Sequence, residues 1–341
     1  MNLPIIARRA AYCLTSPLPT GYRRRNRQVI GWTGTLLLLA AWLCAFGAGA
    51  QPLKLAGQVT NAATGAPVAY ASVGVVGKPI GATADAQGRF AFAVASGLLA
   101  PTEAVVVSCV GFEAQTRQVG DFAAGPVRVA LAATEVALAE VEVKRSGRSV
   151  ARRFGFRGEG RSYQHKLCGE PKTFDANQAF PAAVEMGLIV ALKPGEDTFL
   201  DELRVFVEQN HAVGAKLRVN VYDVANGLPA RLLSQQDALF DVPARHTGWL
   251  ALNLRHYHVL LAGRDRAAVT VQWVAGEPPA TGQARAGDTP PTAYLFLSGV
   301  WPARRHSYVY RAASQSPWNT RHRFWRGTLS FYVEATSYQR N

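Results

Sequence analysis

The chain has 341 residues, enough for two ordinary domains, and carries a net charge of +14 at pH 7. It contains four cysteines, and no pair of them has zinc-ribbon spacing, so that class of small metal-stabilised domain is excluded. Six arginines and no acidic residue lie in the first 50 positions, which leaves a net charge of +8 for the remainder.

The first 50 residues have the three parts of a secretory signal peptide. A basic segment ends at Arg27, an uncharged run extends from Val29 to Ala50, and Ala48-Gly49-Ala50 offers a cleavage site of small residues. The run of roughly 20 residues could also span a bilayer, so a retained anchor is the alternative to cleavage, which we favour. A lipid-modified Cys44 fits less well, because Trp42-Leu43 precedes it. We expect export to the periplasm, the outer membrane or the medium, with membrane contact only through an uncleaved N-terminal segment.

Residues 51–132 read as a first β-sandwich. Turn-forming clusters at residues 61–65 and 83–88 separate short apolar runs. Phe90, Phe92 and Val94 alternate with smaller or charged residues, which is the period of a strand with one buried face. Short strands with turns at near-regular spacing are typical of an antiparallel sandwich.

Several spaced positions in this stretch agree with one known pattern. They are Gly57-x-Val59, Thr64-Gly65-x-Pro67-Val68, Ala71-Ser72-Val73, Gly81-x-Thr83-x-Asp85-x-x-Gly88-x-Phe90 and Val107-Ser108-Cys109-Val110-Gly111-Phe112. In these positions the chain resembles the carboxypeptidase-like regulatory domain, a transthyretin-like sandwich found in exported and outer-membrane proteins of the Bacteroidetes type. The resemblance implies an accessory role, because in such proteins the module accompanies an activity and does not itself cleave peptides.

Residues 133–161 are predicted as a linker, with an alternating segment at 135–143 and a stretch rich in Gly and Arg at 146–161. The alternating segment is similar to the connector of TonB-dependent receptors, but too few residues follow for their plug and barrel. Residues 162–341 again alternate like strands, as at 203–208 and 217–222, and contain the turn dipeptide Asn226-Gly227. The predicted fold class is therefore all-β, with an N-terminal transthyretin-like β-sandwich and a second, jelly-roll-like β-sandwich.

The sequence contains none of the catalytic motifs sought. A zinc carboxypeptidase needs a His-x-x-Glu pair, and none of the seven histidines is followed at the third position by Glu. A Gly-x-Ser-x-Gly elbow and a Gly-Lys-Ser/Thr phosphate loop are also absent. We therefore predict no catalytic residue and no cofactor. The alternative is a hydrolase directed at a glycan or a peptide, with an unrecognised site in residues 162–341, where the carboxylates include Glu185, Asp201, Glu202 and Glu208.

Two weak metal sites and one disulfide stay open as alternatives. His256 and His258 would share a face of a strand and could meet one metal ion, although a solvated strand face is the commoner outcome. Asp237 and Asp241 could bind calcium through their carboxylates. Cys109 and Cys168 could pair in an oxidising compartment, although their positions in the sequence do not require it.

The last 41 residues combine seven arginines, one acidic residue and many aromatic rings. Planar rings can stack on sugars while arginine binds hydroxyls or carboxylates, so we predict ligand-binding candidates there: Trp301, Tyr308, Tyr310, Trp318, Arg321 and Trp325. The alternative is that the rings pack in the core and the arginines are solvated. An exported protein seldom meets nucleic acid, so a glycan or an envelope protein is the expected partner.

These observations together predict a non-catalytic exported cell-envelope protein. Its accessory sandwich would carry a second β domain that binds a glycan, a peptide or a protein partner. A purely structural surface spacer and the hydrolase described above are the competing hypotheses.

Overall fold

The structure is a computed structural model that describes residues 51–134, 149–158, 163–168, 173–174, 184–277, 293–300, 307–320 and 328–339. These residues form strands and two short 3-10 helices, which confirms the all-β prediction. No helix within the described ranges is long and apolar enough to cross a membrane. The predicted signal peptide and the candidates Trp301, Arg321 and Trp325 lie outside the described residues.

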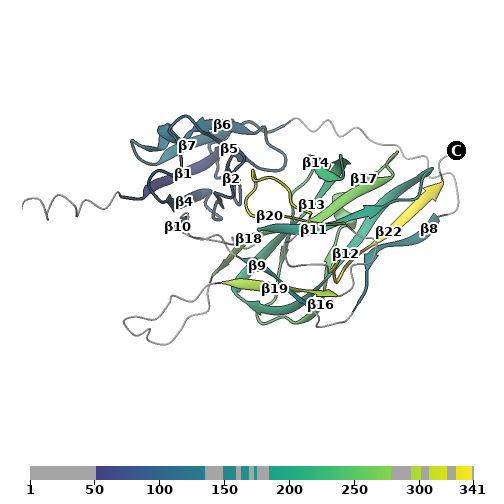
Figure 1. Ribbon diagram of the computed structural model, residues 1–341. Coiled ribbons are helices and arrows are strands. Elements are labelled where there is room, and N and C mark those ends of the chain that lie inside the picture. The colour runs from purple at the N-terminus through teal and green to yellow at the C-terminus, as the bar shows by residue number, and fades with distance from the viewer. Residues whose placement is uncertain are drawn as a thin grey trace, which may run out of the picture. The chain divides into compact units, whose positions relative to one another are not determined.

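A first sandwich is built from two four-stranded sheets (Figure 1). One sheet has the order β10 (Thr173–Phe174), β4 (Arg89–Val94), β1 (Leu53–Asn61) and β7 (Val127–Leu131). The other has the order β3 (Gly81–Thr83), β2 (Ser72–Val75), β5 (Ala104–Ser108) and β6 (Gln115–Gln118), and the 3-10 helix η1 (Val119–Phe122) follows β6. We call these two sheets together with η1 the first sandwich.

Alternation and turn chemistry explain the strands of the first sandwich. Phe90, Phe92 and Val94 of β4 are buried as predicted, because side chains two positions apart share one face of a strand. The turn before β4 is fixed by Asp85, whose Oδ1 accepts hydrogen bonds of 2.8 Å from two later backbone N–H groups. Gly88 closes this turn at φ +70, and a Cβ there would lie 2.4 Å from the carbonyl oxygen of Val59.

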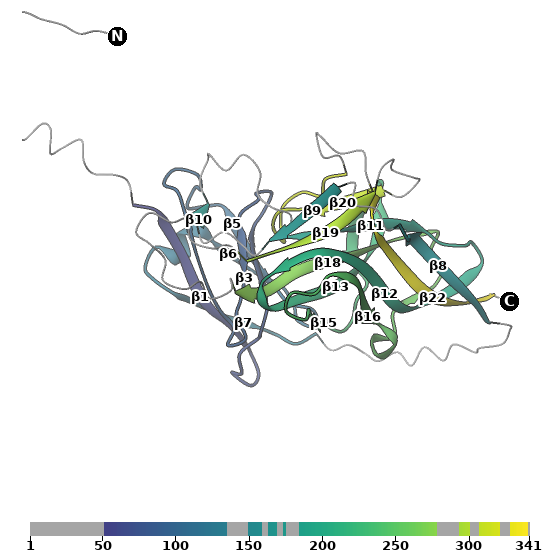
Figure 2. The same cartoon turned by 90° about the horizontal axis from the view of Figure 1, so that it is seen from below.

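A second sandwich contains a sheet of six strands and a sheet of eight. The six-stranded sheet has the order β14 (Leu228–Leu232), β13 (Val213–Ala225), β18 (Arg266–Glu277), β11 (Glu185–Ala191) and β20 (Ser307–Arg311), with β15 (Ala238–Asp241) paired to β13. The eight-stranded sheet has the order β21 (Thr328–Leu329), β19 (Tyr294–Val300), β12 (Glu196–His211), β22 (Phe331–Gln339) and β8 (Ser149–Phe156). In this sheet β16 (Gly248–Asn253) and β17 (Leu260–Leu261) pair with β12, and β9 (Tyr163–Cys168) pairs with β19. We call these two sheets the second sandwich (Figure 2).

Two features of the second sandwich bear on the sequence predictions. Asn226 and Gly227 adopt φ of +53 and +74 between β13 and β14, as a tight hairpin turn requires. Residues 149–156, by contrast, were predicted as part of the linker and form β8, which pairs with β22 over eight residue pairs. This stretch forms a strand because alternate side chains point to the same face, and Phe154 on that face packs against the core of the second sandwich.

Each sandwich has its own apolar core, and the residues from Gln51 to Asn341 form one compact unit. The larger core lies in the second sandwich and includes side chains from both of its sheets, such as Leu188, Leu217 and Val269 from one and Leu203 and Phe331 from the other. Alternate residues of the six-stranded sheet must therefore point away from this core.

Candidate functional site

Part of the face of the six-stranded sheet that points away from the core is polar and yet buried, whereas Ile189, Ala268 and Val309 form a small apolar cluster on the same face. Its charged and polar side chains are almost inaccessible to solvent: Glu185, Arg218, Asn220, Thr270 and Gln272 are each exposed by 3% or less. An antiparallel sheet commonly leaves one face in water, so this burial is unexpected from the strand pattern. Buried polar groups need hydrogen-bond partners.

Glu185, the first residue of β11, is the centre of this network. Its Oε1 accepts hydrogen bonds from Asn220 Nδ2 at 2.8 Å, from the Tyr222 hydroxyl at 2.9 Å and from Thr270 Oγ1 at 2.5 Å. Its Oε2 accepts a hydrogen bond from Arg311 Nε at 2.7 Å and forms an ion-pair contact with Arg311 Nη2 at 2.5 Å. The carboxylate therefore accepts four hydrogen bonds and has one further ion-pair contact on its two oxygens.

Strand register brings these donors together. Glu185 is paired with Arg311 across to β20, and Asn220 of β13 is paired with Thr270 of β18. Gly187 lies opposite Thr270 on β11, and a Cβ there would meet the Thr270 Cα at 2.6 Å. The missing side chain at Gly187 gives the threonine hydroxyl room to reach the carboxylate.

The network holds Glu185 in its charged form. Burial by itself raises the pKa of this carboxyl, but the charge of Arg311 and the hydrogen bonds from Thr270 and Asn220 outweigh it, so the pKa falls below its usual value. Burial is also the main reason why the pKa of the Tyr222 phenol is raised. Glu185 is thus an anion, and Tyr222 is a neutral donor to it.

A second buried ion pair lies on the same face, two residues before Asn220. Arg218 donates to both oxygens of Asp237, at 2.5 and 2.9 Å, and to Gln272 Oε1 at 3.3 Å. Burial lowers the pKa of the guanidinium, but the hydrogen bonds and charge of Asp237 outweigh it and the pKa is raised. Arg218 is therefore charged and fully engaged, although 97% of its side chain is hidden from water.

This second ion pair is also in contact with the first sandwich. Arg218 Nη2 donates to the Tyr70 carbonyl oxygen at 2.9 Å, and Gln272 Nε2 donates to Ser72 Oγ at 3.2 Å. Tyr70 has a φ of +56, an uncommon conformation for a residue with a side chain. The polar face is therefore buried, at least in part, because the first sandwich covers it.

The loop after β20 makes a further contact with the first sandwich. The Gly77 N–H donates to the Gln315 carbonyl oxygen at 3.1 Å. A Cβ on Gly74 would come within 2.7 Å of Ser314 Oγ and 2.9 Å of Gln315 Cγ, so the loop approaches β2 where a side chain is missing. The two sandwiches thus share specific hydrogen bonds as well as packed surface.

The hydrogen bonds that Glu185 already accepts limit the chemistry that the network can perform. A carboxylate that accepts four hydrogen bonds, and whose pKa is lowered, is a poor proton acceptor near neutral pH. The arginines and the tyrosine are used in the same way, as donors within the network. The arrangement is suited to fixing the sheet and its neighbour in one geometry.

The structure places three of the predicted ligand-binding residues. Tyr308 and Tyr310 are half-buried and stacked with ring centroids 5.4 Å apart, and both pack against the core of the second sandwich. Trp318 is half-buried edge-to-face with Tyr222 at 5.5 Å, and the Arg311 guanidinium lies 4.5 Å from its ring centroid. These contacts are packing contacts, and the ligand-binding role of these residues stays a prediction.

The weaker metal candidates have other environments in the structure. His256 lies in the 3-10 helix η2 (Arg255–Tyr257) and His258 caps it at φ +46, so the prediction that they share a strand face is wrong. A turn forms there because Asn253 Oδ1 accepts from the Arg255 N–H. Among the described residues, no group of three or more His, Cys, Asp or Glu could hold a metal ion.

The remaining alternatives concern single side chains. Asp237 binds Arg218, and Asp241 is paired with Lys216, so neither carboxylate of the suggested calcium site is free. Cys109 is a free cysteine in the structure.

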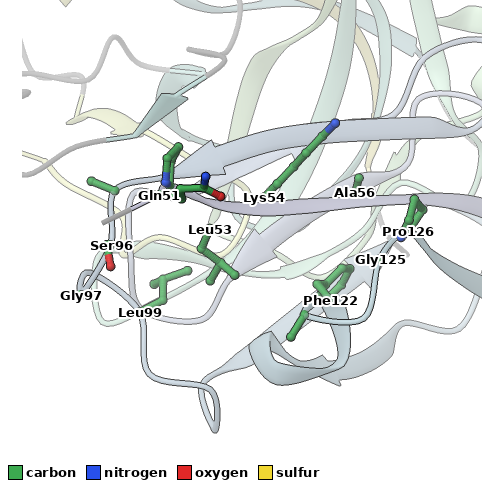
Figure 3. A pocket seen from close by; sticks show the side chains of 13 residues that line it. Gln51, Leu53, Lys54, Ala56, Ser96, Gly97, Leu99, Phe122, Gly125 and Pro126 are labelled. Carbon is green, nitrogen blue, oxygen red and sulfur yellow. The ribbon is translucent and has the colours of Figure 1, made fainter. Parts of the chain in front are cut away.

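A groove of about 540 Å³ lies in the first sandwich, near the start of β1 (Figure 3). Leu53, Leu99 and Phe122 line it together with the loops at 95–97 and 123–126. Lys54 is the one charged residue in its lining. Within the described part of the chain, the lining is therefore uncharged apart from Lys54.

Glu185 is one of the carboxylates noted in the sequence, but its hydrogen-bond network was not predicted. Arg311 belongs to the arginine-rich tail, where the alternative was a solvated side chain, and it is 14% exposed. The usable signal was the run Arg218, Asn220 and Tyr222 in β13 beside Thr270 and Gln272 in β18, with polar side chains alternating in otherwise apolar strands.

Comparisons with known proteins agree with the first part of this description. Residues 55–143 match the family profile of the CarboxypepD_reg-like domain, which confirms the predicted resemblance. No curated protein matches the chain. One solved structure, a candidate membrane-associated protein of unknown function from Bacteroides fragilis NCTC 9343, is similar over 72% of this chain and 97% of its own, at 12% identity and a TM-score of 0.19.

Proposed function

We propose that the protein is a non-catalytic exported cell-envelope protein in which the CarboxypepD_reg-like first sandwich is an accessory module held against the second sandwich. The second sandwich would then carry the surface that binds a glycan, a peptide or a protein partner. The leader-like first 50 residues support export, and the family match supports the accessory role.

The observation that carries this proposal is the use of the buried polar face. Its arginine and glutamine, Arg218 and Gln272, are hydrogen-bonded to Tyr70 and Ser72 of the first sandwich. Its carboxylate, Glu185, is saturated with donors. This buried polar part of the second sandwich is thus occupied in fixing the accessory module, which favours a structural or binding role over a reaction at this site.

Export and activity can be tested on the protein made from the full chain. After fractionation of expressing cells, we expect it in the envelope or the medium, with an N-terminus at or near Gln51. Purified protein should bind isolated envelope material in a sedimentation assay without releasing reducing sugars or new amino termini from it. A cytosolic protein with an intact leader, or turnover abolished by one substitution between residues 184 and 339, would contradict the proposal.

A further inference from the structure

Three aromatic rings form a continuous row on the outer face of the eight-stranded sheet. Phe206 of β12 and Trp249 of β16 are direct cross-strand partners, with ring centroids 5.3 Å apart at 86°. Trp249 also meets Tyr332 of β22 at 5.0 Å and 65°. Figures 1 and 2 both show β16, β12, β22 and β8 close together. We call Phe206, Trp249 and Tyr332 the aromatic platform.

The platform faces away from the core of the second sandwich. The neighbours of Phe206 along β12, Val205 and Val207, are buried in that core, so Phe206 points to the opposite side. Phe206 and Trp249 are half-buried and keep part of their surface in solvent, whereas Tyr332 is 2% exposed and supports them from the side.

Two ion pairs border the aromatic platform on the same face. Arg153 of β8 lies with its guanidinium carbon 5.0 Å from the Tyr332 ring centroid and donates to Glu334 at 3.0 Å. Arg204 is opposite Tyr332 in the register and is bound to Glu202. The side chains of Arg153, Glu334 and Arg204 are 51%, 38% and 37% exposed, so their polar groups are accessible.

The balance of positive and negative side chains on this face restricts the kind of partner that it could bind. Among the described residues, Arg153 and Arg204 are each matched by a carboxylate, so this part of the face shows no surplus of positive charge for a nucleic acid or an anionic lipid surface. It offers partly exposed aromatic rings beside adjacent hydrogen-bond donors and acceptors. A sugar ring has the complementary surface, namely a face of C–H groups bordered by hydroxyls that both donate and accept.

We propose that this face binds a neutral glycan. Trp249 and Phe206 stack on sugar rings, while Arg153, Arg204 and their carboxylate partners form hydrogen bonds with hydroxyl groups. This proposal rests on the proposed binding function and deepens it, and it places the site on the sheet opposite Trp318 rather than in the arginine-rich tail.

Calorimetric titration of the exported protein with cellohexaose and with chitohexaose tests the proposal, and hexagalacturonate serves as the anionic comparison. We expect at least one neutral hexasaccharide to bind in preference to the anionic one. Trp249→Ala should weaken that binding about tenfold, the effect of returning about 60 Å² of apolar surface to water. Arg153→Gln should weaken it severalfold without affecting folding, because the side chain is exposed. Phe240→Ala, on β15 of the six-stranded sheet, is the aromatic control and should bind as the unmodified protein does.

Different results separate the failure of this site from the failure of the proposed function. Thermal unfolding of each variant shows whether a loss of binding reflects a loss of fold. The site is overturned if neither neutral hexasaccharide binds, if only the anionic one binds, or if Trp249→Ala and Arg153→Gln both bind like the unmodified protein. Cleavage of either neutral hexasaccharide would instead overturn the non-catalytic function.

Discussion

Replacing Arg311 by methionine tests whether the buried network stabilises the fold as its geometry indicates. Methionine retains most of the apolar stem but removes the hydrogen bond and the ion pair to Glu185 Oε2, together with the 2.9 Å hydrogen bond to the Tyr222 hydroxyl. The three other donors to Glu185 are all on Oε1, so Oε2 would lose its arginine partner inside the protein. Removing one partner of a buried ion pair costs about 3–5 kcal/mol, and we expect a loss of stability of this size at pH 7.

The pH dependence of that loss distinguishes an unpaired charge from a simple packing defect. In the unmodified protein the folded pKa of Glu185 is below its unfolded value of 4.5, so its contribution is present above pH 4.5 and is lost as pH falls through the folded pKa. In Arg311→Met, burial is no longer outweighed, and the folded pKa of Glu185 should rise above the unfolded value. Protonation then favours the folded variant, so its deficit should shrink as pH falls from 7 toward 5.

Urea unfolding followed by tryptophan fluorescence and far-UV circular dichroism, at several values between pH 5 and pH 7.5, measures this deficit. Arg153→Met is the matched control, because its ion pair with Glu334 is half exposed and should contribute less than about 1 kcal/mol. A deficit for Arg311→Met below about 1 kcal/mol, or one that does not change with pH, would refute the reasoning.

Three further predictions concern other parts of the fold. Gly187→Ala should destabilise the protein by about 1–3 kcal/mol in urea unfolding, because the added Cβ would lie 2.1 Å from the Val269 carbonyl oxygen. An unchanged unfolding midpoint would contradict this contact. Hydrogen bonds from Arg152 lower the pKa of Glu196 to about 2 against the effect of burial, so stability should fall between pH 4.5 and pH 2, and this fall should be smaller in Glu196→Gln. Burial raises the pKa of the Cys109 thiol from 9.0 to about 11, so less of it is thiolate at pH 8. Peptide mapping should therefore show that Cys109 is alkylated about a hundredfold more slowly in the folded than in the urea-unfolded protein. Equal rates would show an accessible thiolate.

Local patterns predicted the strands well where one face of each strand is apolar. Phe90, Phe92 and Val94 are buried as their alternation indicated, and Asn226-Gly227 forms the expected hairpin turn. The same rule failed at His256 and His258, because the hydrogen bond that Asn253 Oδ1 accepts from the Arg255 N–H favours a 3-10 turn over an extended chain. It also did not find β8 in the predicted linker, since a strand that contains Ser149, Arg152 and Arg153 is stabilised mainly by its pairing with β22.

The candidate site was harder to predict than the fold because it depends on pairing across the sheet. Glu185 and Arg311 are 126 positions apart in the chain and become neighbours only through the register of β11 and β20. Trp249 and Tyr332 of the aromatic platform are likewise brought together by β12, which lies between their strands. Composition drew attention instead to the tail, where ring density is highest, although Tyr308, Tyr310 and Trp318 are largely used in packing.

The sequence by itself determined that this chain is built from strands, that its residues near 55–143 form a CarboxypepD_reg-like module, and that the apolar half of each alternating strand lies inside. Periodicity and turn residues are local properties, so they can be read along the chain. Only the tertiary structure decided what covers the polar half of each strand, because that depends on which distant segments meet. On the six-stranded sheet the polar face is covered by the first sandwich and becomes a buried network, whereas on the eight-stranded sheet Phe206, Trp249 and Arg153 keep part of their surface in solvent.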